Sequence, residues 1–284
     1  MTWVYLDGAY LSSEEAKVAA DDAGLLYGRG LFETFRARRG AVYLLERHFD
    51  RLEAGARTLG IVLPQTLADL RAAVRTLTEQ CELEDARVRL TLTAGSASGR
   101  PSLLIQARAA TDYPQRLYER GMSALVAPVR RNETSPLARV KSLNCLDSLL
   151  AREQARRAGL DEALFLNTRG RLADGSATNI FLVRDGELLT PPVEDGALPG
   201  ITRGAVLELA HAARIGAHEV SLTLDDLRGA EEAFLTNAVA GLVPLVSVDG
   251  AKVGSGKPGL LTRRLRELYE AAATAPPAHP AADR

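Results

Sequence analysis

Lys141 is the residue of this 284-residue chain whose surroundings most favour covalent chemistry. It lies in LARVKSLN, where an extended run ends and the helical pattern LDSLLAREQARRAG begins, closed by Gly159. A lysine at such a junction can project from firmly held backbone into a cleft. Its amine attacks an aldehyde only when neutral, which requires poor solvation or a neighbouring cation. Because a single lysine at a strand end is usually a solvated surface residue, the prediction depends on what accompanies it.

The elements that must position this lysine begin in the first half of the chain. VYLDGAYL, LFETFRAR and AVYLL read as strands, with a turn at Arg39 and Gly40. Apolar residues at steps of three and four predict helices over 45–59, ended by Gly60, and over 67–81. Strict alternation in RVRLTLT predicts a strand over 87–93.

Weak patterning in DYPQRLYER places the connection between two domains within residues 112–120. The predicted domains are therefore a smaller one over 1–115 and a larger one over 120–271. The second half predicts strands near 122–129, 163–167, 179–184 and 231–236, and helices near 144–158, 202–213 and 258–271. The Pro/Ala-rich residues 272–284 are expected to form a disordered tail.

Composition excludes several classes of function. A net charge of −1 gives no support for broad attraction to nucleic acid or to an anionic membrane. The chain has no long apolar run and its first residues lack a secretory signal, so we expect a cytoplasmic enzyme. Two distant cysteines and four histidines without ligand spacing make a metal site improbable. The chemistry then falls to lysine, carboxylates, arginines or an organic cofactor.

Five further segments accompany Lys141 in a fixed order: YGRGLFETFR, ERHFDRL, LNTRGRLADGSATNIFLV, ALPGITRGAVLELA and EAFLTNAVAGLVPLVSVDG. Together they resemble the class IV pyridoxal-phosphate enzymes, the family of branched-chain and D-amino acid transaminases and of 4-amino-4-deoxychorismate lyase. The resemblance runs from about residue 3 to residue 270. It implies a mixed α/β fold of type IV in two domains, with the cofactor in the cleft between them, and a homodimer that acts on a small amine or amino acid.

The resemblance also assigns roles to residues that hold the cofactor. Lys141 would bond to the cofactor aldehyde and later shuttle a proton, and Arg51 would bind the phosphate, as a guanidinium fork suits a phosphate dianion. Ile201 and Thr202 would offer backbone N–H groups at a helix N-terminus, which favours a phosphate. The other phosphate-contacting turn would contain Asn237 and Ala238; many transaminases have threonine at the latter position.

Asp174 departs from the family pattern. The family normally has glutamate five residues before the asparagine of NIF, where its carboxylate keeps the pyridine nitrogen protonated. Aspartate is one methylene shorter, so it serves only if the backbone moves inward or a water bridges the gap. Cys145 is a second departure, since several relatives have tyrosine there, and we assign it no catalytic role.

The predicted substrate face distinguishes the candidate reactions. Alternation puts Phe32, Thr34 and Arg36 on one side of LFETFR, the side that faces the pocket in the family. Branched-chain transaminases have glycine in place of Thr34 and D-amino acid transaminases an aliphatic residue, whereas FET, TNAV and RRNETSP resemble the lyases. Arginines suit a substrate with two carboxylates, and the candidates are Arg29, Arg87 and Arg89. The alternative is that the last two pair with nearby acidic residues at the surface.

In the lyase reaction Lys141 would remove a proton from the amine-bearing carbon, pyruvate would leave from the neighbouring carbon, and the ring would become 4-aminobenzoate. Thr34 would help to place the leaving group or a proton. Three interpretations stay open, namely this lyase, a D-amino acid or branched-chain type transaminase, and a cofactor-binding protein without catalysis. The last is motivated by Asp174 and Ala238.

Overall fold

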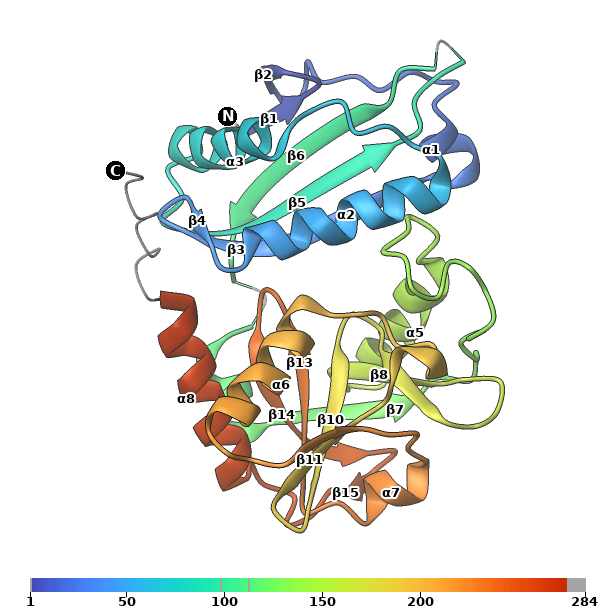
Figure 1. Cartoon of the computed structure of the whole chain (residues 1–284), viewed down its shortest axis with the longest axis vertical. Helices are drawn as coiled ribbons and strands as arrows, with labels where there is room; N and C mark the ends of the chain where they lie inside the picture. Colours follow the sequence, from blue (N-terminus) through green and yellow to red (C-terminus); the bar gives the residue numbers. More distant parts are fainter. Residues whose placement is uncertain (1, 98, 112, 275–284) are drawn as a thin grey trace.

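The computed structural model describes residues 2–97, 99–111 and 113–274, which form two β-sheets with helices packed on them. The first sheet is antiparallel throughout and has the order β2-β1-β6-β5-β3-β4. Its strands are β1 (Trp3–Leu6), β2 (Ala9–Ser12), β3 (Gly30–Arg38), β4 (Ala41–Val42), β5 (Asp85–Thr93) and β6 (Ser102–Ala109). Its helices are α1 (Ala23–Tyr27), α2 (Leu45–Leu59) and α3 (Leu67–Gln80). Figure 1 shows α2 and α3 lying across the sheet.

The second sheet mixes parallel and antiparallel pairs in the order β12-β11-β10-β13-β14-β7-β8-β9, with β15 paired to β14. Its strands are β7 (Met122–Val126), β8 (Glu162–Leu166), β9 (Leu172–Gly175), β10 (Asn179–Arg184), β11 (Glu187–Thr190), β12 (Ala217–Glu219), β13 (Glu232–Asn237), β14 (Gly241–Val248) and β15 (Ala251–Lys252). The helices around it are α4 (Gln115–Arg120), α5 (Leu146–Arg157), α6 (Ile201–Ala212), α7 (Leu224–Arg228) and α8 (Leu260–Thr274), with a 3-10 turn η1 (Val193–Asp195). The predicted mixed α/β fold is confirmed.

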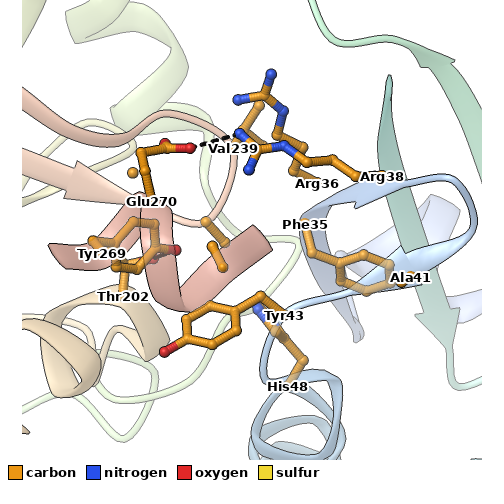
Figure 2. A pocket seen from close by; sticks show the side chains of 13 residues that line it. Phe35, Arg36, Arg38, Ala41, Tyr43, His48, Thr202, Val239, Tyr269 and Glu270 are labelled. Atoms are coloured by element: carbon orange, nitrogen blue, oxygen red, sulfur yellow. Dashed lines mark hydrogen bonds and ion pairs between the residues drawn. The ribbon is translucent and has the colours of Figure 1, made fainter. Parts of the chain in front are cut away.

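The C-terminal helix α8 meets the first sheet at the junction between the two halves. Arg38 of β3 pairs with Glu270 at 2.8 Å, and Tyr43 meets Tyr269 edge to face with ring centres 5.6 Å apart. Figure 2 shows these side chains around a small hollow of about 30 Å³, room for about one water. The last helix therefore ties the two halves together beside the larger cavity described below.

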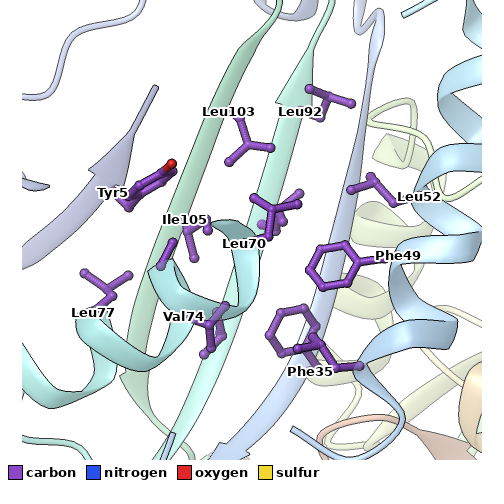
Figure 3. Packing of buried hydrophobic residues seen from close by; sticks show 14 of the residues in the cluster. Tyr5, Phe35, Phe49, Leu52, Leu70, Val74, Leu77, Leu92, Leu103 and Ile105 are labelled. Atoms are coloured by element: carbon purple, nitrogen blue, oxygen red, sulfur yellow. The ribbon is translucent and has the colours of Figure 1, made fainter. Parts of the chain in front are cut away.

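One face of the first sheet forms a closed apolar core with α2 and α3. Phe35 and Ile105 from the strands meet Leu52 and Leu70 from the helices, and each of these side chains is at most 2% exposed. Figure 3 shows them pointing toward one another between sheet and helices. Because strand residues alternate, this packing turns Phe32 and Thr34 of β3 to the opposite face, toward the second half of the chain. The packing of this core therefore orients the predicted substrate face of β3 toward the second half of the chain.

Two sequence expectations differ from the structure. The connection expected within 112–120 is not one of them, and it includes the short helix α4. The segment expected as a tail from residue 272 begins inside α8, which continues to Thr274, and the remainder of that expectation falls on 275–284, outside the described residues. AVYLL forms only the two-residue strand β4, after which α2 begins. None of the helices in the described ranges is long and apolar enough to span a bilayer.

Candidate active site

A cavity of about 420 Å³ lies between the two halves of the chain and has the size of a small-molecule site. Its described lining carries far more positive than negative charge. The arginines and the lysine there are Arg51, Arg87, Arg89, Arg131, Lys141 and Arg152. Asp174 is the one carboxylate among the described lining residues. Such a cavity favours anionic ligands, including a phosphate and a carboxylate.

The backbone around Lys141 is hydrogen-bonded to the start of β3. The carbonyl of Lys141 accepts from Phe32 N–H at 2.9 Å, and the N–H of Leu143 donates to Gly30 at 3.0 Å. Ser142 forms an isolated antiparallel bridge with Leu31 between these bonds. Lys141 is thus held where the first half of the chain meets the second, and its side chain extends into the cavity.

The environment of the Lys141 amine favours its neutral form. Burial, followed by the nearby cations Arg51 and Arg89, lowers the pKa of Lys141 to about 8, against the opposing carboxylates of Glu33 and Asp174. The Nζ atom lies 4.6 Å from the centre of the Phe32 ring. An amine with this pKa is unprotonated often enough near neutral pH to attack an aldehyde.

Arg51 is fixed by a buried carboxylate. Its Nε and Nη2 donate to the two oxygens of Glu33 at 2.8 and 2.7 Å, and His48 Nδ1 lies 2.8 Å from the same group. Burial alone would raise the pKa of Glu33, but Arg51 and His48 bring it down to about 2. The third anchor is Arg51 Nη1, which donates to the carbonyl of Pro199 at 2.9 Å. The guanidinium is therefore preorganised beside the turn that precedes α6.

The N-terminus of α6 and the β13–β14 turn both reach this cavity. Helix α6 begins at Ile201 with Gly200 as N-cap and no side-chain cap, so its first N–H groups are available for a phosphate. Asn237 shapes the second turn, because its Oδ1 accepts from the N–H groups of Val239 and Ala240 at 3.0 and 2.8 Å. Ile201, Thr202, Asn237 and Ala238 line the same cavity as Lys141, as a phosphate anchor requires.

Asp174 lies in β9, only 7% exposed, and faces the cavity. Its Oδ1 accepts from Arg131 Nε at 3.0 Å. Burial raises the pKa of Asp174 above its ordinary value, while Arg131 and a backbone N–H from Leu198 act in the opposite direction. The position could thus present a carboxylate to a ring nitrogen in the cavity.

The predicted substrate face is only partly assembled. Phe32 and Thr34 line the cavity, as do Arg87 and Arg89. The guanidinium of Arg89 stacks on the Phe32 ring at 4.0 Å from its centre, and burial lowers the pKa of Arg89. No carboxylate is paired with Arg89 within the described part of the chain, which disagrees with the surface-pairing alternative for this residue.

Two arginines expected at the substrate face lie elsewhere. Arg36 does not line the main cavity, because it lies further along β3 and forms a bidentate ion pair with Asp85. Arg29 instead donates to the backbone carbonyls of Leu59 and Gly60 at the end of α2. In this chain, neither is placed to bind a molecule in the cavity.

Sequence reasoning missed Glu33, His48, Arg131 and Tyr113 at the site. Glu33 carries a signal in the sequence, since it is an acid on the apolar face of an alternating strand, and such a residue needs a buried cationic partner. Arg131 and Tyr113 occur in irregular segments, where no periodicity assigns a side chain to a face. Tyr113 lines the cavity, and its hydroxyl accepts a hydrogen bond from Asn237 Nδ2 at 2.8 Å.

The geometry fits the cofactor that the motifs imply. The cavity combines a lysine of lowered pKa, a preorganised arginine, free N–H groups at a helix start, and a buried carboxylate. Pyridoxal phosphate needs these groups for its aldehyde, its phosphate and its ring nitrogen. No rearrangement of the described backbone is needed to bring them to one cavity.

Comparison with known proteins gives the same assignment. The family described as amino-transferase class IV matches residues 30–248. A Methanocaldococcus jannaschii protein, provisionally named a branched-chain-amino-acid aminotransferase, is 38% identical over 94% of this chain and 95% of its own. A crystal structure of a branched-chain amino acid aminotransferase with pyridoxamine 5'-phosphate has a TM-score of 0.89 and 28% identity, covering 97% of this chain and 95% of that one.

A crystal structure from Legionella pneumophila, of a protein provisionally named a 4-amino-4-deoxychorismate lyase, has a TM-score of 0.84 and 28% identity, covering 92% of this chain and 97% of that one. Both names therefore occur among proteins similar to this one. The family match over residues 30–248 and the lysine-centred cavity show that the chain belongs to the class IV aminotransferase family, with pyridoxal 5'-phosphate as its cofactor.

Proposed function

We propose that the chain is a 4-amino-4-deoxychorismate lyase, which converts its substrate to 4-aminobenzoate and pyruvate. The observation that carries this proposal is the hydroxyl of Thr34. Its Oγ1 atom is buried without a hydrogen-bond partner in the described chain, and Thr34 lines the cavity of Lys141. As it stands Oγ1 is not exposed to the cavity, so the Thr34 side chain would rotate to reach a ligand, and the bond would then satisfy a hydroxyl that is otherwise unpaired. In the lyase reaction the enolpyruvyl group leaves through its ether oxygen, and a hydrogen-bond donor such as the Thr34 hydroxyl would stabilise the charge that develops on this oxygen.

Arg89 lies beside this hydroxyl. Thr34 and Arg89 are register partners on β3 and β5, so the donor and the guanidinium face the same part of the cavity. Arg89 would bind one of the two carboxylates that the substrate carries, and Arg87 lies on the same face of β5 two residues away.

The reaction needs only one cofactor and no second substrate. Pyridoxal phosphate, when bound, accepts the electron pair left when a proton leaves the amine-bearing carbon. Lys141 would take that proton, and Thr34 would donate a hydrogen bond to the ether oxygen as its bond to the neighbouring carbon breaks. One proton returns to the enolpyruvyl methylene to complete pyruvate, so substrate and products balance. Arg51, the α6 N-terminus and the Asn237 turn would hold the phosphate throughout.

Transamination is the second candidate, and the names of the similar aminotransferases favour it. The same cavity would then bind an amino acid whose α-carboxylate pairs with Arg89. The two reactions differ in one requirement: a transaminase needs a keto acid to regenerate the cofactor, and the lyase does not.

The test is to incubate the purified holoenzyme with 4-amino-4-deoxychorismate, without keto acid, and to quantify 4-aminobenzoate and pyruvate. We expect equal amounts of both, none with Lys141→Ala, at least tenfold slower turnover with Thr34→Val, and near-normal turnover with Thr34→Ser. Conversion of the bound cofactor to its pyridoxamine form by D-alanine or L-leucine, with no 4-aminobenzoate formed, would replace the lyase with a transaminase.

We also propose that the active species is a homodimer. The exposed apolar side chains of α1 and α5 form the proposed contact, and they are Leu25, Leu26, Tyr27, Leu146, Leu149 and Leu150. A hydrogen bond of 2.8 Å from Asn144 Nδ2 to the carbonyl of Gly28 joins the ends of the two helices. Exposed patches of this kind mark association sites, and Leu149 also lines the cavity. Light scattering should give twice the chain mass, and Leu26→Asp should give a monomer.

A further inference from the structure

Arg131 is held rigidly against the cavity wall by three different partners. Its Nε donates to Asp174 Oδ1 at 3.0 Å and its Nη2 to Ser148 Oγ at 3.0 Å. The guanidinium carbon lies 3.9 Å from the centre of the Phe165 ring. These contacts constrain the direction of the guanidinium as well as its position.

The backbone of Arg131 is also fixed next to the strand pair that carries Asp174. Its N–H donates to the carbonyl of Leu166 at 2.9 Å, and it forms an isolated parallel bridge with Asn167. Strand β8, which ends at Leu166, pairs with β9, on which Asp174 lies. Arg131 and Asp174 thus lie on two segments that flank β8, and the hydrogen bonds of each segment to β8 or to the residue after it fix the backbone on both sides of the ion pair.

This arrangement decides the charge of Asp174. Its carboxyl is buried, and the neighbouring Glu162 of β8 adds a repelling negative charge, so both favour uptake of a proton. The groups that favour the ionised form are Arg131, the backbone N–H of Leu198 and, across the cavity, Lys141. Of these, only Arg131 makes a direct ion pair with the carboxylate.

The charge matters because a carboxylate and a carboxylic acid act differently toward a pyridine nitrogen. Only an ionised Asp174 can stabilise a protonated ring nitrogen by charge. The side chain is also one methylene shorter than a glutamate would be, which leaves less freedom to adjust its approach. A fixed partner behind it is therefore more important here than it would be for a longer acid.

We propose that Arg131 is a positioning residue that keeps Asp174 ionised and directs its carboxylate into the cavity. The role toward the cofactor rests on the assignment of Asp174 to the ring nitrogen, whereas the role toward Asp174 itself does not. Arg131 acts through Asp174 and needs no contact with the substrate. The two parts can therefore fail separately.

The first experiment uses the cofactor-free protein, so that catalysis plays no part. Carbon-13 labelled aspartate allows the Asp174 carboxyl to be followed by NMR during a pH titration, with its signal assigned by its loss in Asp174→Asn. In Arg131→Met the midpoint should rise by roughly one to three pH units. Arg131→Lys, which keeps the charge, should restore most of the shift. The matched control is Arg184→Met, which removes a surface arginine paired with Asp226 and should leave the midpoint unchanged.

An Asp174 midpoint that is the same in Arg131→Met and in the wild type would overturn the proposal. If Arg131→Met does not fold, Ser148→Ala removes a single anchor and should still displace the Asp174 signal, and no displacement would count against the proposal. The second experiment compares the pH dependence of the cofactor absorbance in the holoenzymes. Arg131→Met should change it in the same direction as Asp174→Asn. An unchanged spectrum in Asp174→Asn would overturn the cofactor role even if the NMR shift is present.

Discussion

The amine of Lys141 should react as a free base at a pH where an ordinary solvated lysine is still protonated. Its pKa is about 8 because it is buried near Arg51 and Arg89. At pH 7 about 9% of such an amine is neutral, against about 0.04% for a solvated lysine, a difference of roughly 200-fold. This excess of free base is the property that an aldehyde-binding lysine requires.

Removal of Arg89 should weaken this effect by an amount that the geometry bounds. Arg89 and Lys141 lie 4.0 and 4.6 Å from the centre of the Phe32 ring, so their charges are within 8.6 Å of each other. With an effective dielectric constant between about 20 and 80, their repulsion is roughly 0.5 to 2 kcal/mol. Arg89→Gln should therefore raise the pKa of Lys141 by about 0.4 to 1.4 units. Arg36→Gln is the control, since Arg36 lies on the neighbouring strand β3 but outside the cavity.

The assay treats cofactor-free protein with pyridoxal and borohydride at a series of pH values and quantifies the modified peptides by mass spectrometry. Pyridoxal lacks the phosphate, so labelling reports the amine and not the phosphate anchors. The exposed Lys17, Lys252 and Lys257 are internal references in every sample. A Lys141 labelling midpoint equal to that of the references, or one that does not respond to Arg89→Gln, would refute the reasoning.

Three further changes test other parts of the structure. In the wild type, the Glu33 carboxyl has a pKa of about 2 in the folded protein and an ordinary value near 4.5. It therefore stabilises the fold at pH values above 4.5, and this contribution of about 3 kcal/mol is lost as the pH falls to 2. Glu33→Gln should remove this part of the acid-induced loss of unfolding free energy, as measured by urea titration. Gly200→Ala should weaken pyridoxal phosphate binding at least tenfold, as measured by fluorescence titration, because the added Cβ would lie 1.9 Å from Asn179 Oδ1. The control is Gly204→Ala in α6, whose added Cβ meets nothing within 4 Å and which should bind the cofactor normally. Leu70→Ala should cost about 2–5 kcal/mol of stability, and the partly exposed Leu67→Ala in the same helix much less.

Periodicity predicted the elements whose two faces differ strongly in polarity. Helices α2 and α3 and strand β5 carry one apolar face each, and their bounds differ from the prediction by two residues or fewer. Strand β14 was not predicted, because GLVPLVSV is buried on both faces and contains a proline, so it shows neither alternation nor a clear end. Strand β6 was not predicted either, because LLIQARA alternates only in part.

The functional site was likewise predicted in part. Motifs in sequence order located Lys141, Arg51, Ile201 and Asn237, which all reach one cavity. Alternation along β3 correctly put Arg36 on the same face as Phe32. This face of the strand extends beyond the cavity, however, and Arg36, four residues after Phe32, is bound by Asp85 of the neighbouring strand. The two-residue alternation of a strand does not show where along the strand the cavity ends, because this depends on which residues of the second half of the chain lie opposite.

Charge pairing supplies the information that periodicity lacks. The two acids whose charges raise the pKa of Lys141, Glu33 and Asp174, are buried, and each is bound by an arginine from a different part of the chain. Since an unpaired buried carboxylate would take up a proton, an acid in an apolar context predicts a partner, either an arginine or hydrogen-bond donors. The chain has many arginines, and only the fold selects Arg51 and Arg131 from among them. These two pairs leave Arg89 as a cavity cation with no acidic partner in the described chain, which is the group a carboxylate substrate would meet.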